Sequence, residues 1–182
     1  MSKPTTIKDA IANWEQKHNE VAAKAVDIGL QFQWPPIEKM DSNLSVLAEC
    51  RKLSLSTNMI DKIVGISSLK NLKILVLSRN YLKTINGIEV LAETLEQLWV
   101  SYNLIEKLKP IEAMKNLKVF YLSNNNVKEW GELVRLNLAT KLEEITFAGN
   151  PLQEYFEDAV FRSETMRRLP HLKKLDGDPL IR

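Results

Sequence analysis

The apolar residues of this chain recur at a fixed spacing. The pattern L-x-x-L-x-L-x-x-N, with another apolar residue or Cys50 at some leucine positions, occurs five times in succession. Within each copy the apolar and polar residues alternate, which predicts a short strand with one buried face. Apolar residues three positions apart follow each strand, as in Ile60, Ile63 and Ile66, and predict short helical turns. The copies end at Asn58, Asn80, Asn103, Asn125 and Asn150.

A repeat of this length and pattern is typical of leucine-rich-repeat solenoids. We therefore predict an α/β leucine-rich-repeat solenoid, with a curved parallel β-sheet on one face, short helices on the other, and helical caps at both ends. An asparagine amide both donates and accepts hydrogen bonds, so the five asparagines can satisfy backbone groups in stacked turns. We predict that they form a structural ladder and have no catalytic role.

The chain is expected to form one domain over residues 1–182. Its predicted parts are an N-terminal helical cap at 1–36, a partial repeat at 37–49, five repeats at 50–152 and a C-terminal cap at 153–182. The first cap is predicted to contain a helix from Thr5 to about Ala25, and the second a final strand ending near Leu175 and an Asp176-Gly177 turn. Solenoids need such caps because a terminal repeat otherwise exposes core leucines.

Strand residues between the core leucines face the open, concave side of the sheet. At the two ends of the sheet these residues are polar, whereas in the middle three strands they are largely apolar. The predicted partner-binding residues are Ile74, Val76, Gln97, Trp99, Ser101, Val119 and Tyr121. Arg79, Tyr102 and Asn124, which precede ladder asparagines, are predicted to form its rim. Two alternatives stay open: a terminal segment of this chain covers the cluster, or the cluster packs on itself.

The C-terminal cap is rich in basic residues. The residues that could face an acidic surface, such as a microtubule, are Arg162, Arg167, Arg168, Lys173 and Lys174. The alternative is an ordinary solvated helix face.

Composition and motifs argue against several functions. The 25 basic and 23 acidic residues give a net charge of +2, which does not indicate a nucleic-acid partner. No apolar run approaches the roughly 18 residues of a membrane span, and no secretion signal is expected. Cys50, the single cysteine, cannot form an internal disulfide and is predicted to be a small buried residue. With His18 and His171 in opposite caps and no metal or phosphate motif, we expect no cofactor, no metal and no enzyme activity.

Several segments resemble one family. TTIKDAI, PPIEKMD, LSLSTN, ETLEQLWVSYN, AGNPL and RRLPHLKKLDGDP are together similar to the leucine-rich-repeat light chain of axonemal outer-arm dynein, over about Thr5 to Pro179. The chain departs from that family around 19–34 and 154–164.

The resemblance implies a non-catalytic subunit of a ciliary or flagellar motor, in the axoneme. It implies binding to an outer-arm dynein heavy chain at its microtubule-binding stalk region, close to tubulin, and a role in tuning the beat. The capped ends suggest a monomer apart from that complex. The alternative is a cytosolic or nuclear leucine-rich-repeat adaptor that scaffolds a phosphatase or a ribonucleoprotein.

Overall fold

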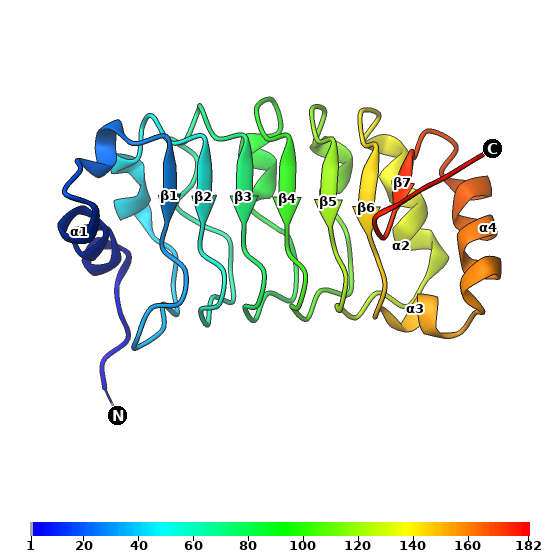
Figure 1. Ribbon diagram of the computed structural model, residues 1–182, viewed down its shortest axis with the longest axis horizontal. Coiled ribbons are helices and arrows are strands. Elements are labelled where there is room, and N and C mark those ends of the chain that lie inside the picture. Colours follow the sequence, from blue (N-terminus) through cyan, green and yellow to red (C-terminus); the bar gives the residue numbers. More distant parts are fainter. Residues whose placement is uncertain (1) are drawn as a thin grey trace.

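The computed structural model describes residues 2–182, and its strands stack side by side in sequence order along one long sheet (Figure 1). Strands β1 to β7 are parallel, and β8 pairs antiparallel with β7. The strands are β1 (Asp27–Gly29), β2 (Lys52–Ser54), β3 (Ile74–Val76), β4 (Gln97–Trp99), β5 (Val119–Tyr121), β6 (Glu144–Thr146), β7 (Lys174–Leu175) and β8 (Asp178–Pro179). This arrangement confirms the predicted solenoid.

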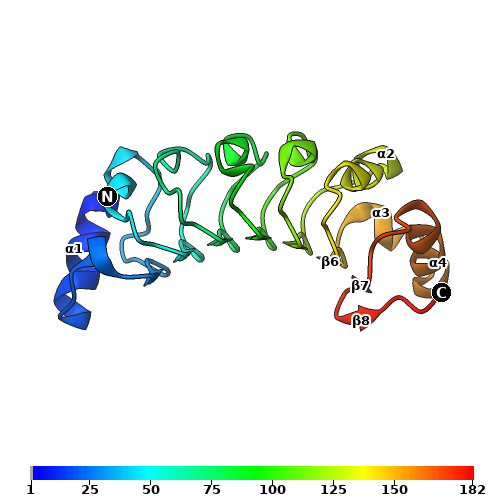
Figure 2. The ribbon, with the colours of Figure 1, turned by 90° about the horizontal axis from the view of Figure 1, so that it is seen from above.

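Helical segments lie opposite the sheet and at the two ends, as Figure 2 shows. The α-helices are α1 (Ile7–His18), α2 (Trp130–Val134), α3 (Pro151–Glu154) and α4 (Asp158–Arg168). The 3-10 helices are η1 (Ala22–Lys24), η2 (Ser42–Val46), η3 (Ile88–Leu91), η4 (Ile111–Ala113) and η5 (Arg135–Leu138). Helix α1 closes one end of the solenoid and α4 the other. Within residues 2–182, no helix has both the length and the apolar character needed to cross a bilayer.

The repeat positions fill a continuous core between the sheet and the helical side. Strand register aligns Leu75 with Leu98 and Leu98 with Phe120, and all three side chains are fully buried. Burying each such side chain contributes roughly 1.5–3 kcal/mol, before the entropy cost of ordering the chain.

The asparagines link neighbouring repeats. Asn103 Oδ1 accepts from the amide of Leu82 at 2.9 Å, and its Nδ2 donates to the carbonyls of Leu77 at 2.9 Å and Val100 at 3.0 Å. The equivalent bonds recur at Asn58, Asn80, Asn125 and Asn150. Each amide therefore satisfies backbone groups from its own repeat and from the one before it.

The first cap differs from the prediction. Helix α1 begins at a capping box formed by Thr6 and Asp9 but ends at His18, where Asn19 adopts a left-handed conformation with φ 54°. The helix expected to reach Ala25 is therefore too long. Strand β1 was not predicted, and it lies inside the segment assigned to the N-terminal cap. The division of the chain into one domain with the stated internal boundaries stays a prediction.

The second cap contains the expected turn and one further strand. Asp176 and Gly177 have positive φ values of 51° and 87°, and they reverse the chain between β7 and β8. The helical region predicted from residue 153 onward is divided into α3 and α4. Trp130, at the start of α2, is partly buried and stacks on Phe161 with ring centroids 5.3 Å apart.

Candidate functional site

The candidate site is the middle of the concave face, where β3, β4 and β5 lie next to one another (Figure 1). Parallel register places Val76 beside Trp99 and Trp99 beside Tyr121. A second row contains Ile74, Gln97 and Val119. The structure therefore brings together the strand residues that the alternation predicted to share this face. Neither described terminal segment crosses these three strands in Figure 1, so they are not covered by the chain itself.

Trp99 is held at the centre of this face by its neighbours. Its ring lies 5.3 Å from the ring of Tyr121, centroid to centroid, with a tilt of 34°. Its Nε1 donates to Gln97 Oε1 at 3.1 Å, and Lys52 Nζ lies 5.5 Å from the ring centroid. The ring is half-buried. Such a fixed, partly exposed aromatic side chain can contact a partner at little further cost in conformational entropy.

Val76 is less exposed than predicted. The strand alternation predicts that Val76 is one of the solvent-facing apolar residues, but its side chain is only 7% exposed. Neighbouring strands are only about 4.8 Å apart, so a small side chain beside a large one such as Trp99 is readily covered. Val76 therefore packs within the sheet surface, whereas Ile74, Val119 and Tyr121 remain half-buried.

A polar border adjoins the aromatic pair. Tyr121 Oη donates to Glu144 Oε1 at 3.0 Å, and Ser123 Oγ donates to Ser101 Oγ at 2.9 Å. Burial, together with the bond to Glu144, raises the pKa of Tyr121 above its usual value, so the phenol stays protonated at neutral pH. The site is thus an apolar centre with satisfied polar groups beside it, which suits a protein partner.

The rim residues share an unusual backbone conformation. Arg79, Tyr102 and Asn124 have positive φ values of 55°, 58° and 54°. The guanidinium of Arg79 lies 4.1 Å from the centroid of the Tyr102 ring, a cation–π contact that orders both side chains.

The C-terminal basic residues make contacts within the molecule that the sequence does not predict. The guanidinium of Arg162 donates to the carbonyls of Leu175, Asp178 and Pro179 at 2.7–3.2 Å, so it fastens the terminal hairpin. Arg168 pairs with Glu164 and lies 4.2 Å from the Trp130 ring centroid.

The other three cations of this group also have acidic neighbours. Arg167 Nη2 lies 2.9 Å from Glu164, Lys173 Nζ lies 2.7 Å from Glu143, and Lys174 Nζ lies 3.7 Å from Glu144. Hydrogen bonds from Arg168 and Lys173 lower the pKa values of Glu164 and Glu143, respectively. The local positive charge is therefore smaller than the sequence suggests. Contact between this group and an acidic surface stays a prediction.

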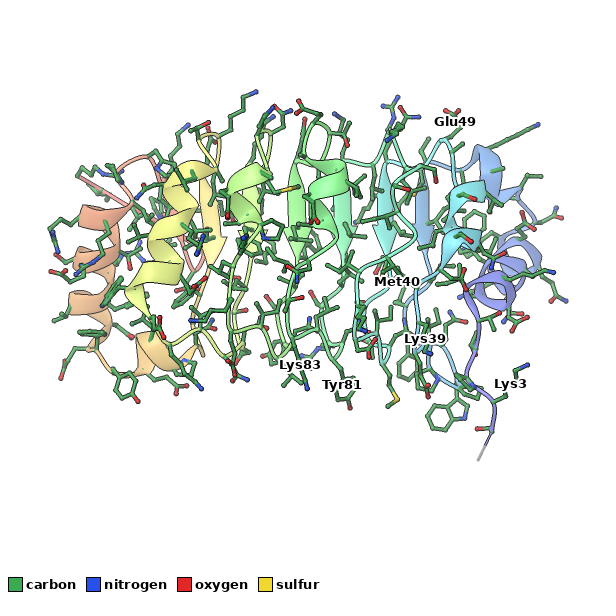
Figure 3. The ribbon with its side chains drawn as sticks, turned by 180° about the vertical axis from the view of Figure 1, so that it is seen from behind. Lys3, Lys39, Met40, Glu49, Tyr81 and Lys83 are labelled. Carbon is green, nitrogen blue, oxygen red and sulfur yellow. The ribbon has the colours of Figure 1, made fainter. Side chains whose placement is uncertain are left out.

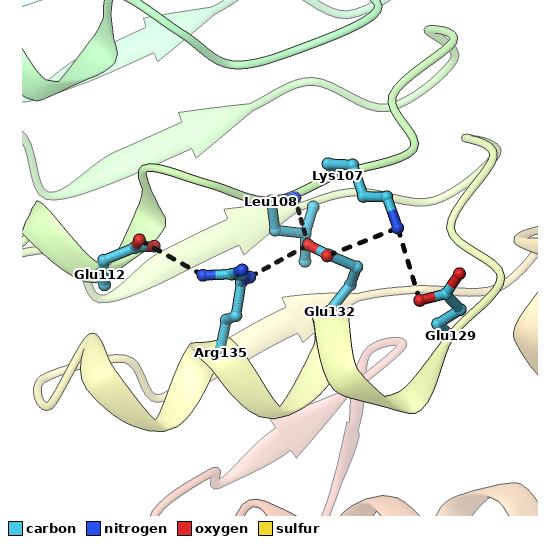
Figure 4. Close-up of polar contacts among 6 residues, drawn as sticks. All are labelled: Lys107, Leu108, Glu112, Glu129, Glu132 and Arg135. Atoms are coloured by element: carbon cyan, nitrogen blue, oxygen red, sulfur yellow. Dashed lines mark hydrogen bonds and ion pairs between the residues drawn. The ribbon is translucent and has the colours of Figure 1, made fainter.

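One buried charge was missed entirely. Glu132 is 8% exposed on the convex side, and its Oε2 accepts from the amide of Leu108 at 2.8 Å. Lys107 and Arg135 lie 3.8 and 3.3 Å from its carboxylate, as Figure 4 shows. Glu132 therefore joins two repeats on the helical side. The only signal in the sequence was its place beside Leu133 in a buried turn.

The residues with potential chemistry do not converge. Cys50 is fully buried, and burial raises its pKa to about 11, so the reactive thiolate is scarce at neutral pH. His18 belongs to α1 and His171 lies between α4 and β7, near opposite ends of the sheet. Among residues 2–182, no three His, Cys, Asp or Glu side chains are grouped so that they could hold a metal ion.

The chain matches one family model and is similar over its whole length to several known proteins. A family model described as leucine-rich repeats in two copies matches residues 93–135. Dynein axonemal light chain 1 of Danio rerio is 58% identical, over 100% of this chain and 95% of that protein. The proteins of the same name from Homo sapiens and Chlamydomonas reinhardtii are 56% and 53% identical, over 100% and 99% of this chain and 96% and 93% of their own lengths.

Solved structures with the same fold are more distant in sequence. A leucine-rich-repeat protein from Leptospira interrogans has a TM-score of 0.63 at 22% identity, over 81% of this chain and 36% of that one. An internalin from Listeria monocytogenes has a TM-score of 0.61 at 16% identity, over 78% of this chain and 38% of that one. These two similarities support the fold alone.

Proposed function

The chain belongs to the dynein axonemal light chain 1 family, and on this basis we propose that it is a non-catalytic, protein-binding subunit of outer-arm dynein. Membership of this family places it in the axoneme of a cilium or flagellum. It also favours a dynein subunit over the phosphatase or ribonucleoprotein adaptor that the sequence alone left open.

The proposed partner is a dynein heavy chain, at the microtubule-binding region of its stalk. The observation that supports this proposal is the apolar centre of the concave face, where the tilted rings of Trp99 and Tyr121 pack together and remain half-exposed. Protein interfaces often gain most of their binding energy from Trp and Tyr side chains at their centre, surrounded by a polar border. In this proposal an apolar element of the heavy chain packs on Trp99, Tyr121, Ile74 and Val119.

A binding site at the stalk would also bring this protein close to the track. We propose that the C-terminal cap then faces the negatively charged microtubule, and that this proximity tunes motor activity and beat. The side chains of Arg167 and Lys173 are 66% and 68% exposed, so they are the members of the basic group best able to reach an acidic surface. Arg162 and Arg168 serve instead to hold the cap together.

The heavy-chain proposal can be tested by truncating the aromatic pair. We expect Trp99→Ala with Tyr121→Ala to weaken binding to a purified heavy-chain stalk region by at least about 30-fold, because truncating even one hot-spot residue costs about 2 kcal/mol or more. Binding is measured by calorimetry, and folding of the variant by circular dichroism.

Tyr155→Ala is the matched control, because Tyr155 is an exposed aromatic residue in the C-terminal cap, away from the concave face. It should bind the stalk region as the unmodified protein does. Unchanged affinity in a folded Trp99→Ala, Tyr121→Ala variant would refute docking on this face.

A further inference from the structure

A second surface lies along the edge formed by the turns that follow β1 to β4. Backbone hydrogen bonds stack these turns in register: Arg79 N donates to Ser101 O at 2.9 Å, and Tyr102 N donates to Ser123 O at 3.0 Å. A few residues further along, Met59 N, Tyr81 N and Leu104 N each donate at 2.8 Å to the carbonyl of a residue in the preceding repeat. Side chains from successive turns are therefore neighbours along this edge.

Large apolar side chains are exposed in each of these turns. The aromatic edge, as we call it, consists of Phe32 (73% exposed), Trp34 (88%), Met59 (43%), Tyr81 (51%), Tyr102 (47%) and Leu104 (39%). Single exposed apolar residues are common, but a contiguous row rarely stays in water without a role. None of the six occupies a core position of the repeat. Fold stability therefore gives no reason for their apolar character.

Unpaired cations border the first part of this edge. Figure 3 shows Lys39, Tyr81 and Lys83 along the same side of the molecule. Within residues 2–182, no carboxylate lies within ion-pair distance of Lys39, Lys62 or Lys83. With Arg79 these four cations outnumber the acids near them, which are Glu38, Asp61 and Glu106.

The later repeats differ at the equivalent turns. Lys107 Nζ lies 3.4 Å from Glu129, and Lys128 Nζ lies 4.0 Å from Glu106. The exposed apolar row also ends there, since Asn126 and Pro151 follow the next two ladder asparagines. Unpaired positive charge and exposed apolar surface therefore coincide in the first repeats, which indicates a partner that is apolar and acidic at once.

We propose that the aromatic edge binds an α-helix of a protein partner that has apolar residues on one face and carboxylates beside them. An α-helix advances about 5.4 Å per turn, close to the spacing of about 4.8 Å between neighbouring strands. A helix lying along the edge would therefore place one apolar residue of each turn near one turn of the solenoid. Glutamates or aspartates on its flanks would meet Lys39, Lys62 and Lys83. This surface adjoins the rim of the concave site at Arg79 and Tyr102, but it does not include the anchors Trp99 and Tyr121 and does not depend on the proposed function.

A synthetic peptide tests the proposal directly. The probe is an amphipathic helix with leucines at i, i+4 and i+7 and glutamates on both flanks. Its control carries lysines in place of the glutamates. At low salt we expect the acidic peptide to bind at least tenfold more tightly than the basic one. In NMR spectra of the full chain, the amide signals of Met59, Tyr81 and Leu104 should shift on binding.

In the peptide titrations, any of three results would overturn the proposal: no binding, equal binding of both peptides, or shifts centred on Trp99. Concentration-dependent shifts at the edge without peptide would also overturn it, because they would assign the surface to a second copy of this chain.

Two sets of variants separate the apolar and charged contributions. Tyr81→Ser with Leu104→Ser should weaken binding of the acidic peptide at least tenfold, while Tyr155→Ser should leave it unchanged. The preference for the acidic peptide should be lost in a triple variant that carries Lys39→Gln, Lys62→Gln and Lys83→Gln. The matched triple variant Lys24→Gln, Lys70→Gln and Lys109→Gln, which changes exposed lysines elsewhere, should retain it. All these side chains are exposed, so the fold should survive; unaltered binding by the edge variants counts against the proposal.

Discussion

At every ladder position one short side chain joins two repeats. The amide of Asn103 contacts the backbone of Leu77, Leu82 and Val100, and the residue itself is only 6% exposed. Water cannot readily replace these bonds in so enclosed a place, so their loss would leave buried backbone groups without partners.

We therefore expect Asn103→Ala to lower the free energy of unfolding by roughly 1–3 kcal/mol. Urea denaturation followed by circular dichroism gives the value. Asn71→Ala is the control, because the Asn71 amide makes one exposed hydrogen bond, to the carbonyl of Ala48. A pair of variants with equal unfolding midpoints would show that the ladder does not stabilise the fold.

Individual residues of the site differ in how well the sequence predicts their position. The direction of Trp99 follows from the two-residue period of a strand, and its row with Tyr121 follows from the repeat. The burial of Val76 depends on the orientation of the large side chains in the neighbouring strands. The two-residue alternation of a strand does not predict that orientation. The burial of Glu132 depends on a backbone amide more than twenty residues away, that of Leu108. These two features therefore required the structure.

Among the elements, the five central strands and β7 were predictable from the sequence, whereas β1 and β8 were not. Each central strand carries the full leucine and asparagine pattern, which is a long-range signal repeated five times. Strand β1 ends at Gly29 and has no ladder asparagine in its turn, whereas β8 has only two residues, Asp178 and Pro179. Such short strands form because a neighbouring strand offers free backbone groups. Whether such a neighbour is present depends on the tertiary structure, which the local sequence does not reveal.

The connecting turn of the second cap holds a partly buried histidine. His171 lies between α4 and β7, and its buried Nε2 has no hydrogen-bond partner in the described structure. Burial, with a smaller contribution from Arg182, lowers the pKa of His171 below its ordinary value of 6.5. The unfolded chain therefore binds the proton more readily than the folded chain does, so stability decreases as the pH falls through and below about 6.5.

We expect His171→Gln to reduce this acid sensitivity. Between pH 7.5 and 5, the urea midpoint of the variant should fall less than that of the unmodified protein. Comparing the two slopes cancels the other titrating groups, which both proteins share. Parallel slopes over this range would show that His171 does not couple protonation of the cap to folding.

On the scale of the whole molecule, charge is distributed unevenly although the net charge is only +2. Ion pairs such as Lys115 with Glu93 and Lys173 with Glu143 lie in the later repeats and the C-terminal cap. Lys39, Lys62 and Lys83 in the earlier repeats have no such partners among the described residues, 2–182. The two ends of the solenoid would therefore respond differently to salt.

Charge reversal tests whether the C-terminal end faces the microtubule. Arg167→Glu with Lys173→Glu should weaken co-sedimentation of the dynein-bound protein with microtubules at low salt, and the difference should diminish as salt rises. Lys70→Glu with Lys109→Glu changes the net charge equally at exposed positions elsewhere and should have little effect. If both double variants co-sediment alike, the C-terminal cap does not contact the track.

Because the strands are stacked along one axis, the resistance of the molecule to force should depend on the direction of the force. The strands lie side by side along the long axis (Figure 1), so the hydrogen bonds between them run nearly parallel to that axis. A pull between α1 and α4 would stretch these bonds and open the repeats one junction at a time, since each repeat holds only its neighbours. A push across the sheet would instead compress the packed core, which resists deformation. The solenoid should therefore yield to tension along its length and resist load across its width.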